Sequence, residues 1–498
     1  MKRSGCLIII MSLMIILVSL FGGLEFCSAQ SNLKTEEPAT STFVVNTNST
    51  HFWVNNNLWL STNATYTIQS AFDNLPAQGG KVFLKAGVYP VNGIYITNKQ
   101  TLNDSPYQQI IFEGEGRQVA TLKLNDNAKG ASSKLESFPD YANKAVIWCE
   151  PYTVDTGLRF TITNIGIDGN RKNQQTEIAG IAVYNDWDSI IEDNYLFECG
   201  GHGIIHLGSR WLRTSYITGN YVYFTDMSGQ NPANPSNPVE NYLSGILSWR
   251  TDVAIRENTV GWTGYRGENS FLGIGISASF ALVDNNWVWG NYLGVLISNG
   301  QFFSLTGNFI ENNVNGVYLW NAHCGTIQSN DIRISCNPDT GIKIGGSSSY
   351  NSIKLNKIWV RDDLTAQYGI RETDTADYNI INDNIIIAKS KTFFSGTNTN
   401  SVGYILTAIA TTGAHSTVSG NNIIQEETNS SSKSRGITMT PEPTTNVIPT
   451  DSDIQYQMPK LSTSECSVGV LLVLLVVGTM ITLFKTKNAE TPFKNPLN

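Results

Sequence analysis

The chain has 498 residues, a formal net charge of -8 at pH 7 and only 15% charged residues. Asn, Ser, Thr and Gly fill the polar positions instead, and the sequence contains no basic stripe. This composition excludes nucleic acid as a partner and is typical of an extracellular surface that relies on hydroxyls and amides.

The N-terminus carries the pattern of an export signal. Met-Lys-Arg precedes the apolar run CLIIIMSLMIILVSLFGGL, and small residues lead up to Ala29. We therefore expect a signal peptide over residues 1–29, with cleavage after Ala29. A retained N-terminal anchor is the alternative, because the apolar run is long for a signal core.

After an N-terminal segment over residues 30–59, residues 60–130 are expected to form a cap and the first coils. Within this region YTIQSAFDNLP (66–76) has apolar residues at helical spacing, namely Ile68, Ala71, Phe72 and Leu75. We expect this short amphipathic helix to cover the open end of the first coil, because an uncovered strand edge pairs readily with other chains.

A repeated pattern dominates residues 131–427. A short apolar strand, an Asn and a second apolar pair recur, as in IIEDNYLF, YITGNYVYF and LVDNNWVW. The marker asparagines lie 22 to 38 residues apart and are Asn194, Asn220, Asn258, Asn286, Asn308, Asn330, Asn356, Asn384 and Asn422. Between most of them lies another short strand that opens with Gly and an aliphatic residue, as in GIIHL, GVYLW and GIKIG.

A period in the twenties, with strands and turns but no helix, predicts one coil per repeat. No single coil buries its apolar face, but stacked coils do, and they hydrogen-bond at a spacing of about 4.8 Å. The recurring Asn suits a bend, where its side chain bonds backbone groups, and successive asparagines stack as a ladder. The repeat therefore predicts an all-β fold, a parallel β-helix.

The C-terminal part is expected to attach the protein to a membrane. Residues 428–466 are rich in Ser, Thr and Pro and predict an extended stalk, since such a segment cannot bury a core. The uncharged run SVGVLLVLLVVGTMITLF (467–484) is just long enough to span a bilayer as a helix. Lysines follow it, so residues 485–498 are expected on the cytoplasmic side and the preceding domain outside.

Export also bears on particular asparagines and cysteines. Four Asn-x-Ser/Thr sequons predict a glycoprotein: Asn48, Asn63, Asn103 and Asn429. Four cysteines within the domain allow up to two disulfides, with three connectivities left open: Cys149, Cys199, Cys324 and Cys336. No Cys/His spacing typical of a metal site is present in the sequence.

Three segments at the start of the solenoid carry a family resemblance: AFDNLPAQGGKVFLKAGVY (71–89), IIFEGEGRQVATLKL (110–124) and ITNIGIDGNRKNQ (162–174). With the Asn-marked coils they resemble the pectate-lyase superfamily, specifically its pectate-lyase-3-like proteins, over about residues 60–425. The resemblance implies a single-stranded right-handed parallel β-helix of the pectin-lyase-like kind, which binds extended polysaccharide along one sheet. Members include lyases, hydrolases, epimerases and proteins without demonstrated catalysis, so the fold alone does not give the activity.

The stretch CGGHGIIHLGSR (199–210) also resembles the Gly-His-Gly segment of polygalacturonase-type glycoside hydrolases. The resemblance implies that His202 lies beside two acidic residues, and Asp186 and Asp188 lie one coil upstream, although they are not an adjacent Asp-Asp pair. An inverting hydrolase needs two carboxyl groups about 6.5–9.5 Å apart, one as acid and one as base. The alternative is structural, with His202 in a turn and His206 pointing inward as a core histidine.

A lyase mechanism would use different residues. It needs a base, often Arg or Lys, and usually Ca²⁺ held by carboxylates to acidify the sugar C5 proton. Arg210 and Arg250 are the candidate bases, Asp168 and Lys172 are alternative acid/base groups, and Ca²⁺ would be the cofactor. The structural alternative is that Asp168 begins a turn and that the basic residues form a solvated rim.

Outward aromatic side chains are candidate sugar platforms, because rings contact sugar faces and their polar tips form hydrogen bonds. We expect four such residues, two or four places after a coil's Gly, to bind substrate: Tyr184, Trp249, Tyr318 and Trp320. The alternative is that some of them pack beneath the Pro-rich loop 228–242.

Two functions of different classes remain. The first is a membrane-anchored extracellular enzyme acting on polysaccharide, a lyase or a hydrolase. The second is a non-catalytic cell-surface adhesin or envelope component that binds a glycan. Enzymes concentrate titratable groups in one cleft, whereas adhesins spread aromatic and amide groups over a face. The candidate catalytic residues are Asp186, Asp188, His202, Arg210 and Arg250.

Overall fold

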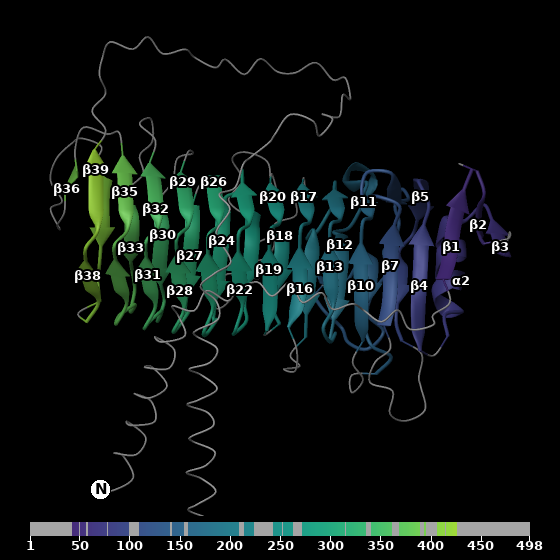
Figure 1. Ribbon diagram of the computed structural model, residues 1–498, viewed down its shortest axis with the longest axis horizontal. Coiled ribbons are helices and arrows are strands. Elements are labelled where there is room, and N and C mark those ends of the chain that lie inside the picture. Colours follow the sequence, from purple (N-terminus) through teal and green to yellow (C-terminus); the bar gives the residue numbers. More distant parts are fainter. Residues whose placement is uncertain are drawn as a thin grey trace, which may run out of the picture. The chain divides into compact units, whose positions relative to one another are not determined.

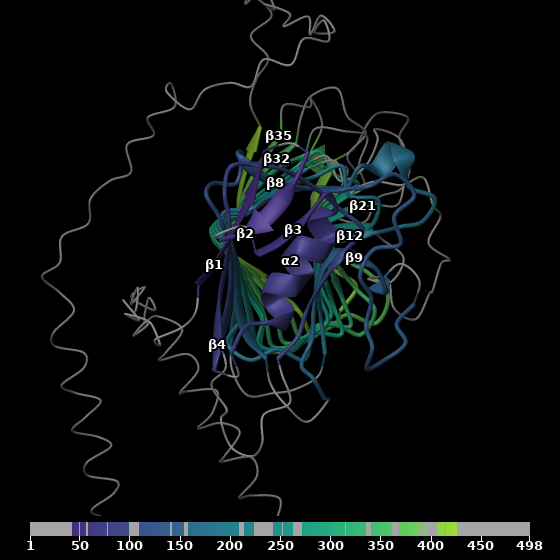
Figure 2. The ribbon, with the colours of Figure 1, turned by 90° about the vertical axis from the view of Figure 1, so that its right-hand side faces the viewer.

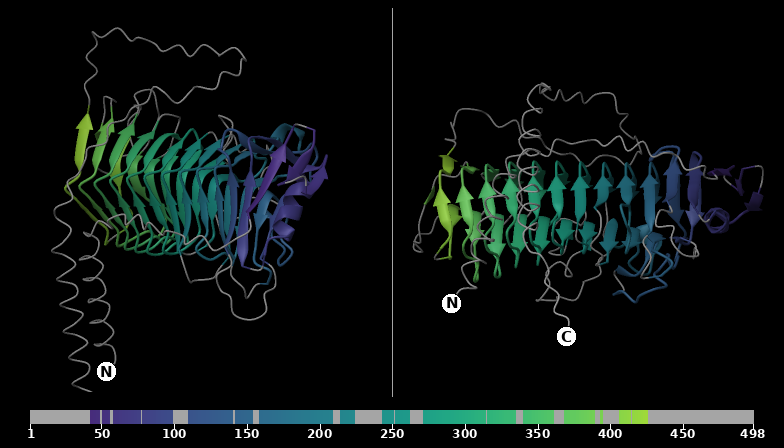
Figure 3. Two further views of the ribbon diagram at one scale, coloured as in Figure 1. Left: turned by 45° about the vertical axis from the view of Figure 1, so that its right-hand side comes forward. Right: turned by 60° about the horizontal axis from the view of Figure 1, so that its bottom comes forward.

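The structure is a computed structural model, and it describes residues 42–48, 50–55, 58–76, 78–98, 109–139, 142–153, 158–208, 214–223, 243–250, 252–261, 271–313, 315–334, 340–360, 368–388, 393–394, 406–413 and 415–425. They form a solenoid of three sheets, whose strands stack along one axis (Figures 1 and 3). Each coil passes through one strand of each sheet, which we name sheets A, B and C.

The 15-stranded sheet A contains, in spatial order, β3 (Leu58–Ser61), β2 (Phe52–Val54), β1 (Thr42–Thr47), β4 (Gly79–Leu84), β7 (Gln109–Gly114), β10 (Arg159–Thr163), β13 (Ile190–Glu192), β16 (Ser215–Thr218), β19 (Val253–Arg256), β22 (Leu282–Asp284), β25 (Ser304–Thr306), β28 (Thr326–Gln328), β31 (Ser352–Lys354), β34 (Ile380–Asn382) and β38 (Thr417–Ser419). The 12-stranded sheet B contains β5 (Gly87–Val91), β8 (Ala120–Leu124), β11 (Gly166–Asp168), β14 (Tyr195–Phe197), β17 (Tyr221–Tyr223), β20 (Thr259–Gly261), β23 (Trp287–Trp289), β26 (Phe309–Asn313), β29 (Asp331–Ile334), β32 (Lys357–Val360), β35 (Ile385–Ala388) and β39 (Asn422–Gln425). The 12-stranded sheet C contains β6 (Ile94–Ile96), β9 (Ala145–Cys149), β12 (Ala179–Tyr184), β15 (Ile204–Leu207), β18 (Leu243–Ser248), β21 (Phe271–Ile276), β24 (Leu293–Ser298), β27 (Asn315–Trp320), β30 (Thr340–Gly345), β33 (Tyr368–Glu372), β37 (Leu406–Ala410) and β36 (Phe393–Phe394).

The strands of successive coils pair in parallel and in register. In sheet A, Ile191 pairs with Ile217 and Ile217 with Ile255, so one column of aliphatic side chains runs through the core. The parallel β-helix predicted from the repeat is confirmed. Each coil has three strands. The Asn-marked pattern supplies two of them, one on each side of the Asn, and the strand that opens with Gly and an aliphatic residue is the third.

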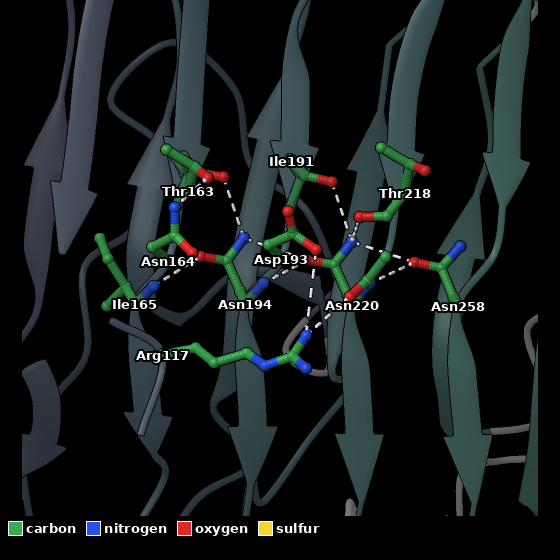
Figure 4. A network of polar contacts seen from close by, with 12 residues as sticks. Arg117, Thr163, Asn164, Ile165, Ile191, Asp193, Asn194, Thr218, Asn220 and Asn258 are labelled. Carbon is green, nitrogen blue, oxygen red and sulfur yellow. Dashed lines mark hydrogen bonds and ion pairs between the residues drawn. The ribbon is translucent and has the colours of Figure 1, made fainter. Parts of the chain in front are cut away.

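The asparagine ladder lies at the bend between sheets A and B, and Figure 4 shows its first members. The Nδ2 group of each Asn donates to the Oδ1 atom of the next, at 3.0 Å from Asn194 to Asn220 and 2.9 Å from Asn286 to Asn308. Asn194 Nδ2 also donates to the carbonyl of Ile162, and its backbone N–H donates to Asn220 Oδ1. Hydrogen bonds of this kind satisfy the polar groups that the bend buries.

The last ladder residue is Asn421 and not Asn422, which corrects the sequence prediction. Asn384 Nδ2 donates to Asn421 Oδ1 at 2.9 Å, whereas Asn422 is the first residue of β39. The sequence GNN offers two asparagines, and backbone conformation decides between them. The residue before the ladder position is left-handed, and Gly420, with a φ of 65°, adopts this conformation without strain.

Helix α2 (Ala64–Asp73) covers the N-terminal end of the solenoid (Figure 2). The Oδ1 atom of Asn63 caps it by accepting from the backbone N–H of Tyr66 at 3.2 Å. Its buried face includes Ile68 and Phe72, and the Phe72 ring packs edge-on against Phe112 of the core. The predicted amphipathic cap is confirmed, and it begins two residues earlier than expected. A second, one-turn helix is η2 (Arg171–Asn173).

The structure contains no disulfide among the three described cysteines of the domain. Cys149 and Cys199 are buried free thiols in the core, and Cys324 is an exposed free thiol. Burial raises the pKa of both core thiols, so they remain protonated and act as small apolar side chains. The expected pairings among these three are therefore corrected, while Cys336 lies outside the described residues.

In the described part of the chain, no helix is long and apolar enough to cross a membrane. The predicted signal peptide, stalk, anchor and cytoplasmic tail all lie outside that part and stay predictions.

Removing one ladder residue should destabilise the fold. In Asn286→Ala, the amide groups of Asn258 lose their acceptor and the carbonyl of Ile255 loses its donor, all at buried positions. Each buried group left without a partner costs about 1–3 kcal/mol. We expect a clear fall in the urea midpoint of the full-length chain. Asn421→Ala, at the half-buried end of the ladder, is the matched control and should lower the midpoint less; equal effects would contradict this account.

Candidate functional site

The predicted acid Asp186 is part of a buried polar cluster. It follows β12 at the corner between sheets C and A, and its side chain is fully buried. Oδ1 contacts His206 Nε2 at 2.8 Å, and Oδ2 accepts from the hydroxyl of Ser215 at 2.7 Å. The guanidinium of Arg250 donates both to the carboxylate and to the carbonyl of Asp186. The structure therefore brings together Asp186 and Arg250, two of the predicted catalytic residues.

The electrostatics of this cluster favour a permanent ion pair. Burial by itself would raise the pKa of Asp186, but His206 and Arg250 outweigh that effect and hold the pKa well below its usual range. Arg250 is also fully buried, so the expectation that it belongs to a solvated rim is corrected. A carboxylate that stays ionised behind a guanidinium and has no access to solvent is not placed to exchange a proton with a bound sugar.

The hydrogen bond of His202 is to a residue outside this cluster. It is fully buried, and its Nδ1 atom accepts from the backbone N–H of Ser244 at 3.0 Å. Burial lowers its pKa to about 3, so the ring is neutral at physiological pH. His206 is the buried inward histidine that the alternation of β15 predicts. Asp188 is half-buried in the turn after Asp186, and Arg210 lies outside the described residues.

Asp168 and Lys172 are placed on another part of the coil. Asp168 ends β11 in sheet B, where its Oδ1 atom accepts from the N–H of Asn170 at 2.8 Å. Lys123 Nζ lies 3.6 Å from its Oδ2 atom. Lys172 lies in η2, after the turn that Asp168 begins. The structure therefore does not join these two to the cluster of Asp186.

The outer face of sheet C is covered at its N-terminal part. This corrects the prediction that Tyr184 is an outward ring available to bind substrate. The segment 131–139 lies on it, and Phe138 packs on Tyr184 with 5.1 Å between ring centroids, leaving Tyr184 5% exposed. Glu150 holds this segment, because its carboxylate accepts from Ser133 Oγ and from the backbone N–H of Lys134. Trp249 is half-buried against the same cluster of outward side chains.

Further along sheet C, Tyr318 and Trp320 are half-exposed and pack against the cluster of outward side chains, with the Nε1 atom of Trp320 buried. The register places Tyr318 beside Lys343 and Lys343 beside Arg371, so an aromatic ring and two cations form one outward column. Trp320 pairs with Gly345 in the next outward column. Sequence reasoning missed Lys343 and Arg371, although both occupy the position two places after a coil's Gly, where the aromatic residues were sought.

Gly345 is buried beside Trp320, among several polar groups. A Cβ at this position would lie 3.0 Å from the hydroxyl of Tyr318, 3.1 Å from Thr373 Oγ1 and 3.1 Å from Asp374 Oδ2. Several hydrogen-bonding groups therefore converge where no side chain stands. We name this arrangement the Gly345 site; its members are Tyr318, Trp320, Lys343, Gly345, Arg371, Thr373 and Asp374.

The Gly345 site contains two cations, Lys343 and Arg371, and one carboxylate, Asp374. Lys343 Nζ lies 4.7 Å from the ring centroid of Tyr318, and the guanidinium of Arg371 lies 4.3 Å from that of Tyr368. Neither cation forms an ion pair with a described carboxylate. Rings hold these cations in place while leaving their charge available to a ligand. The site is thus suited to a sugar ring that carries an acidic group.

The described residues contain no group of three or more His, Cys, Asp or Glu side chains that could hold a metal ion. Their histidines are dispersed: His206 bonds Asp186, His323 bonds Ser349 and His415 bonds Asp377, each with a different coil's residue.

Residues 211–402, less than half of the chain, match the family described as periplasmic copper-binding protein (NosD). No curated protein matches the chain.

Two solved structures show similarity at low identity. The A-module of the mannuronan C-5 epimerase AlgE4 from Azotobacter vinelandii is 17% identical, with a TM-score of 0.47, over 72% of this chain and 96% of its own. The DFA-IIIase from Arthrobacter chlorophenolicus A6 is 14% identical, with a TM-score of 0.45, over 71% of this chain and 88% of its own. No residue role in this protein rests on these similarities.

The ion pair of Asp186 makes a prediction for stability. Asp186→Asn leaves Arg250 buried without a counter-charge, and breaking a buried pair costs about 3–5 kcal/mol. The folded pKa of Asp186 is depressed, so the contribution is present above the unfolded pKa of about 3.9 and is lost as the pH falls through the folded value. Urea unfolding at pH 7 should show the full loss in the free energy of unfolding. The difference in this free energy between variant and wild type should shrink below pH about 4. Asp331→Asn, which breaks the partly exposed ion pair with Arg333, is the control and should cost no more than about 1 kcal/mol.

Buried His202 predicts a second pH dependence. Its folded pKa is about 3, below the unfolded value of about 6.5, so the unfolded chain binds a proton in that interval while the folded chain does not. Stability is therefore present above pH about 6.5 and falls by about 1.4 kcal/mol per pH unit between these two values. His202→Asn keeps an acceptor for Ser244 and should remove this slope between pH 6 and pH 4. Parallel plots of the free energy of unfolding against pH for wild type and His202→Asn would contradict this role of His202.

Proposed function

We propose that this protein is an extracellular β-helix that binds an acidic polysaccharide at the Gly345 site. The observation that carries the proposal is the pairing of half-exposed rings with two cations that no described carboxylate neutralises. An aromatic face contacts the C–H groups of a sugar ring, and a cation beside it attracts a uronate carboxylate. The hydroxyl groups of Tyr318 and Thr373 and the carboxylate of Asp374 converge at Gly345 and can bond a sugar hydroxyl.

Binding without cleavage is the better-supported function of the two. Of the predicted catalytic groups, Asp186, His202 and Arg250 are fully buried. Asp186 is ionised within its pair with Arg250, and His202 is neutral and bonded to backbone. A general acid must reach the leaving oxygen of the substrate, and these side chains face the interior. The lyase and hydrolase mechanisms therefore stand as the alternative.

We infer further that the solenoid is right-handed. We also infer that the signal peptide over residues 1–29 directs its export and that residues 467–484 anchor it to the outer face of a membrane. Support comes from the charge and hydropathy of both ends and from the periplasmic description of the similar family. The stalk 428–466 would then place the glycosylated solenoid away from the bilayer. Protease treatment of intact cells should release the solenoid, whereas release without protease would contradict the anchor.

Binding should depend on the cations and the ring of the Gly345 site. We expect Lys343→Met and Trp320→Ala each to weaken binding of the full-length chain to polygalacturonate about tenfold, the loss typical of an anchoring contact. Gly345→Ala should weaken it as well, because the added methyl group would displace the polar groups of Tyr318, Thr373 and Asp374. Calorimetric titration at low and high salt measures this, and the Lys343→Met variant should show the weaker salt dependence. Lys354→Met on sheet A is the control, and an equal loss in that variant would overturn the assignment.

An activity assay separates binding from catalysis. The full-length chain is incubated with a polysaccharide panel, with and without EDTA, and both unsaturated-product absorbance and new reducing ends are followed. We expect neither signal. Absorbance that EDTA abolishes would instead indicate a Ca²⁺-dependent lyase. Reducing ends that His202→Ala abolishes would indicate a hydrolase.

A further inference from the structure

A second aromatic surface lies on sheet B, whose strands form the upper row in Figure 1. In β14, β17 and β23 the middle residue is buried, and the first and third residues point outward. These outward positions, continued by the first residue of β26, form what we name the sheet B strip: Tyr195, Phe197, Tyr221, Tyr223, Trp287, Trp289 and Phe309.

The rings of the sheet B strip form one continuous series. Ring centroids are 5.9 Å apart for Tyr195 and Tyr223, 6.1 Å for Tyr223 and Trp289, and 6.2 Å for Trp289 and Trp287. Phe309 continues the series 6.3 Å from Trp287, which is 44% exposed. Trp287 is exposed and the other six rings are partly buried, so the series reaches the surface over several coils. A series of surface rings of this kind is a candidate binding site.

Gly261 makes the series continuous where a coil contributes no ring. It belongs to β20, which lies between β17 and β23 in sheet B. A Cβ at Gly261 would lie 2.4 Å from the ring of Trp289, so the indole lies against bare backbone. A larger residue would displace Trp289 and separate it from Tyr223. The glycine therefore joins the rings of β17 and β23 into one surface.

The charges at both ends of the sheet B strip are compensated. Arg117 stacks on Tyr221 at 4.1 Å, donates to the carbonyl of Gly219 and lies 3.9 Å from Asp193 Oδ1 (Figure 4). At the other end Arg333 stacks on Phe309 and is paired with a carboxylate of its own strand at 3.0 Å. Within the sheet B strip both arginines are paired with carboxylates, whereas Lys357 further along sheet B stacks on Trp359 and forms no ion pair with a described carboxylate.

The composition of the strip distinguishes an open sugar platform from a covered apolar surface. Where this chain covers an outer face, on sheet C, buried aliphatic residues such as Leu247 and Leu272 lie together with the rings of Trp148 and Tyr184. The outward positions of β14 to β32 that the structure describes contain rings, Thr, Gly and charged residues but no aliphatic side chain. Glu311 accepts from Trp287 Nε1 at 3.0 Å, so a carboxylate acceptor lies beside the most exposed ring.

We propose that the sheet B strip binds a neutral polysaccharide, whose chain runs along the solenoid axis across four or more coils. Rings contact the C–H faces of successive sugar units, and Glu311 accepts hydrogen bonds from their hydroxyl groups. This inference goes beyond the proposed function and does not rest on it, because the strip and the Gly345 site share no residue and lie on different sheets.

The test uses the full-length chain and two soluble neutral polysaccharides, hydroxyethyl cellulose and galactomannan, with polygalacturonate as the acidic comparison. We expect Trp287→Ala to weaken binding to at least one neutral polymer about tenfold and to leave polygalacturonate binding unchanged. Trp287→Phe keeps a ring and should weaken it less. Tyr216→Ala removes a similarly exposed ring from sheet A, where Tyr216 is 40% exposed, and should have no effect.

Each contrary outcome overturns the proposal. Wild type that binds neither neutral polymer, or equal losses in Trp287→Ala and Tyr216→Ala, would remove the sugar assignment. Unchanged neutral binding in Trp287→Ala, together with lost self-association in sedimentation, would make the strip a protein interface. Trp320→Ala tests the Gly345 site in the same titrations, so failure of the proposed function shows with polygalacturonate alone.

Discussion

The hydrogen bonds between coils are the constraint on which the rest of this molecule depends. No coil satisfies its own backbone groups or buries its own side chains, so every coil must present the same edges to its two neighbours. The bend between sheets A and B is the strictest point, since an amide side chain there must bond the coil before it and the coil after it at once. Asn meets this demand, and its recurrence keeps the coils in register.

Because the ladder and the inward aliphatic columns fix the coils, the outward residues vary without affecting the fold. Many outward residues of sheet A are small and polar, whereas sheet B carries a series of aromatic rings on its outer face. On sheet C, part of the outer face is covered by other residues of the chain. The covered part is held by Glu150, whose carboxylate accepts from Tyr95, Ser133 and Trp148. The Gly345 site lies further along sheet C, where Tyr318 and Trp320 are half-exposed.

The buried cluster around Asp186 illustrates how a solenoid interior can hold charge. Its carboxylate has lost water but has gained a guanidinium, an imidazole and a hydroxyl, each from a later coil. These partners tie successive coils together at the corner between sheets C and A. An ionised carboxylate held in this way stabilises a particular register of the coils, and it is chemically unlike a catalytic acid that must exchange its proton with a ligand.

The sequence by itself determined the solenoid, because a repeat of strand, Asn and strand has only one way to bury its apolar residues. It determined the capping helix too, since the spacing of Ile68 and Phe72 is local. It did not decide which asparagine, Asn421 or Asn422, joins the ladder, because that choice depends on where the left-handed residue falls in the coil. Nor did it decide that Tyr184 is buried, that Tyr318 is half-exposed, or that Asp186 is buried in an ion pair with Arg250. These outcomes depend on contacts between residues tens of positions apart, which only the stacking of the coils brings together.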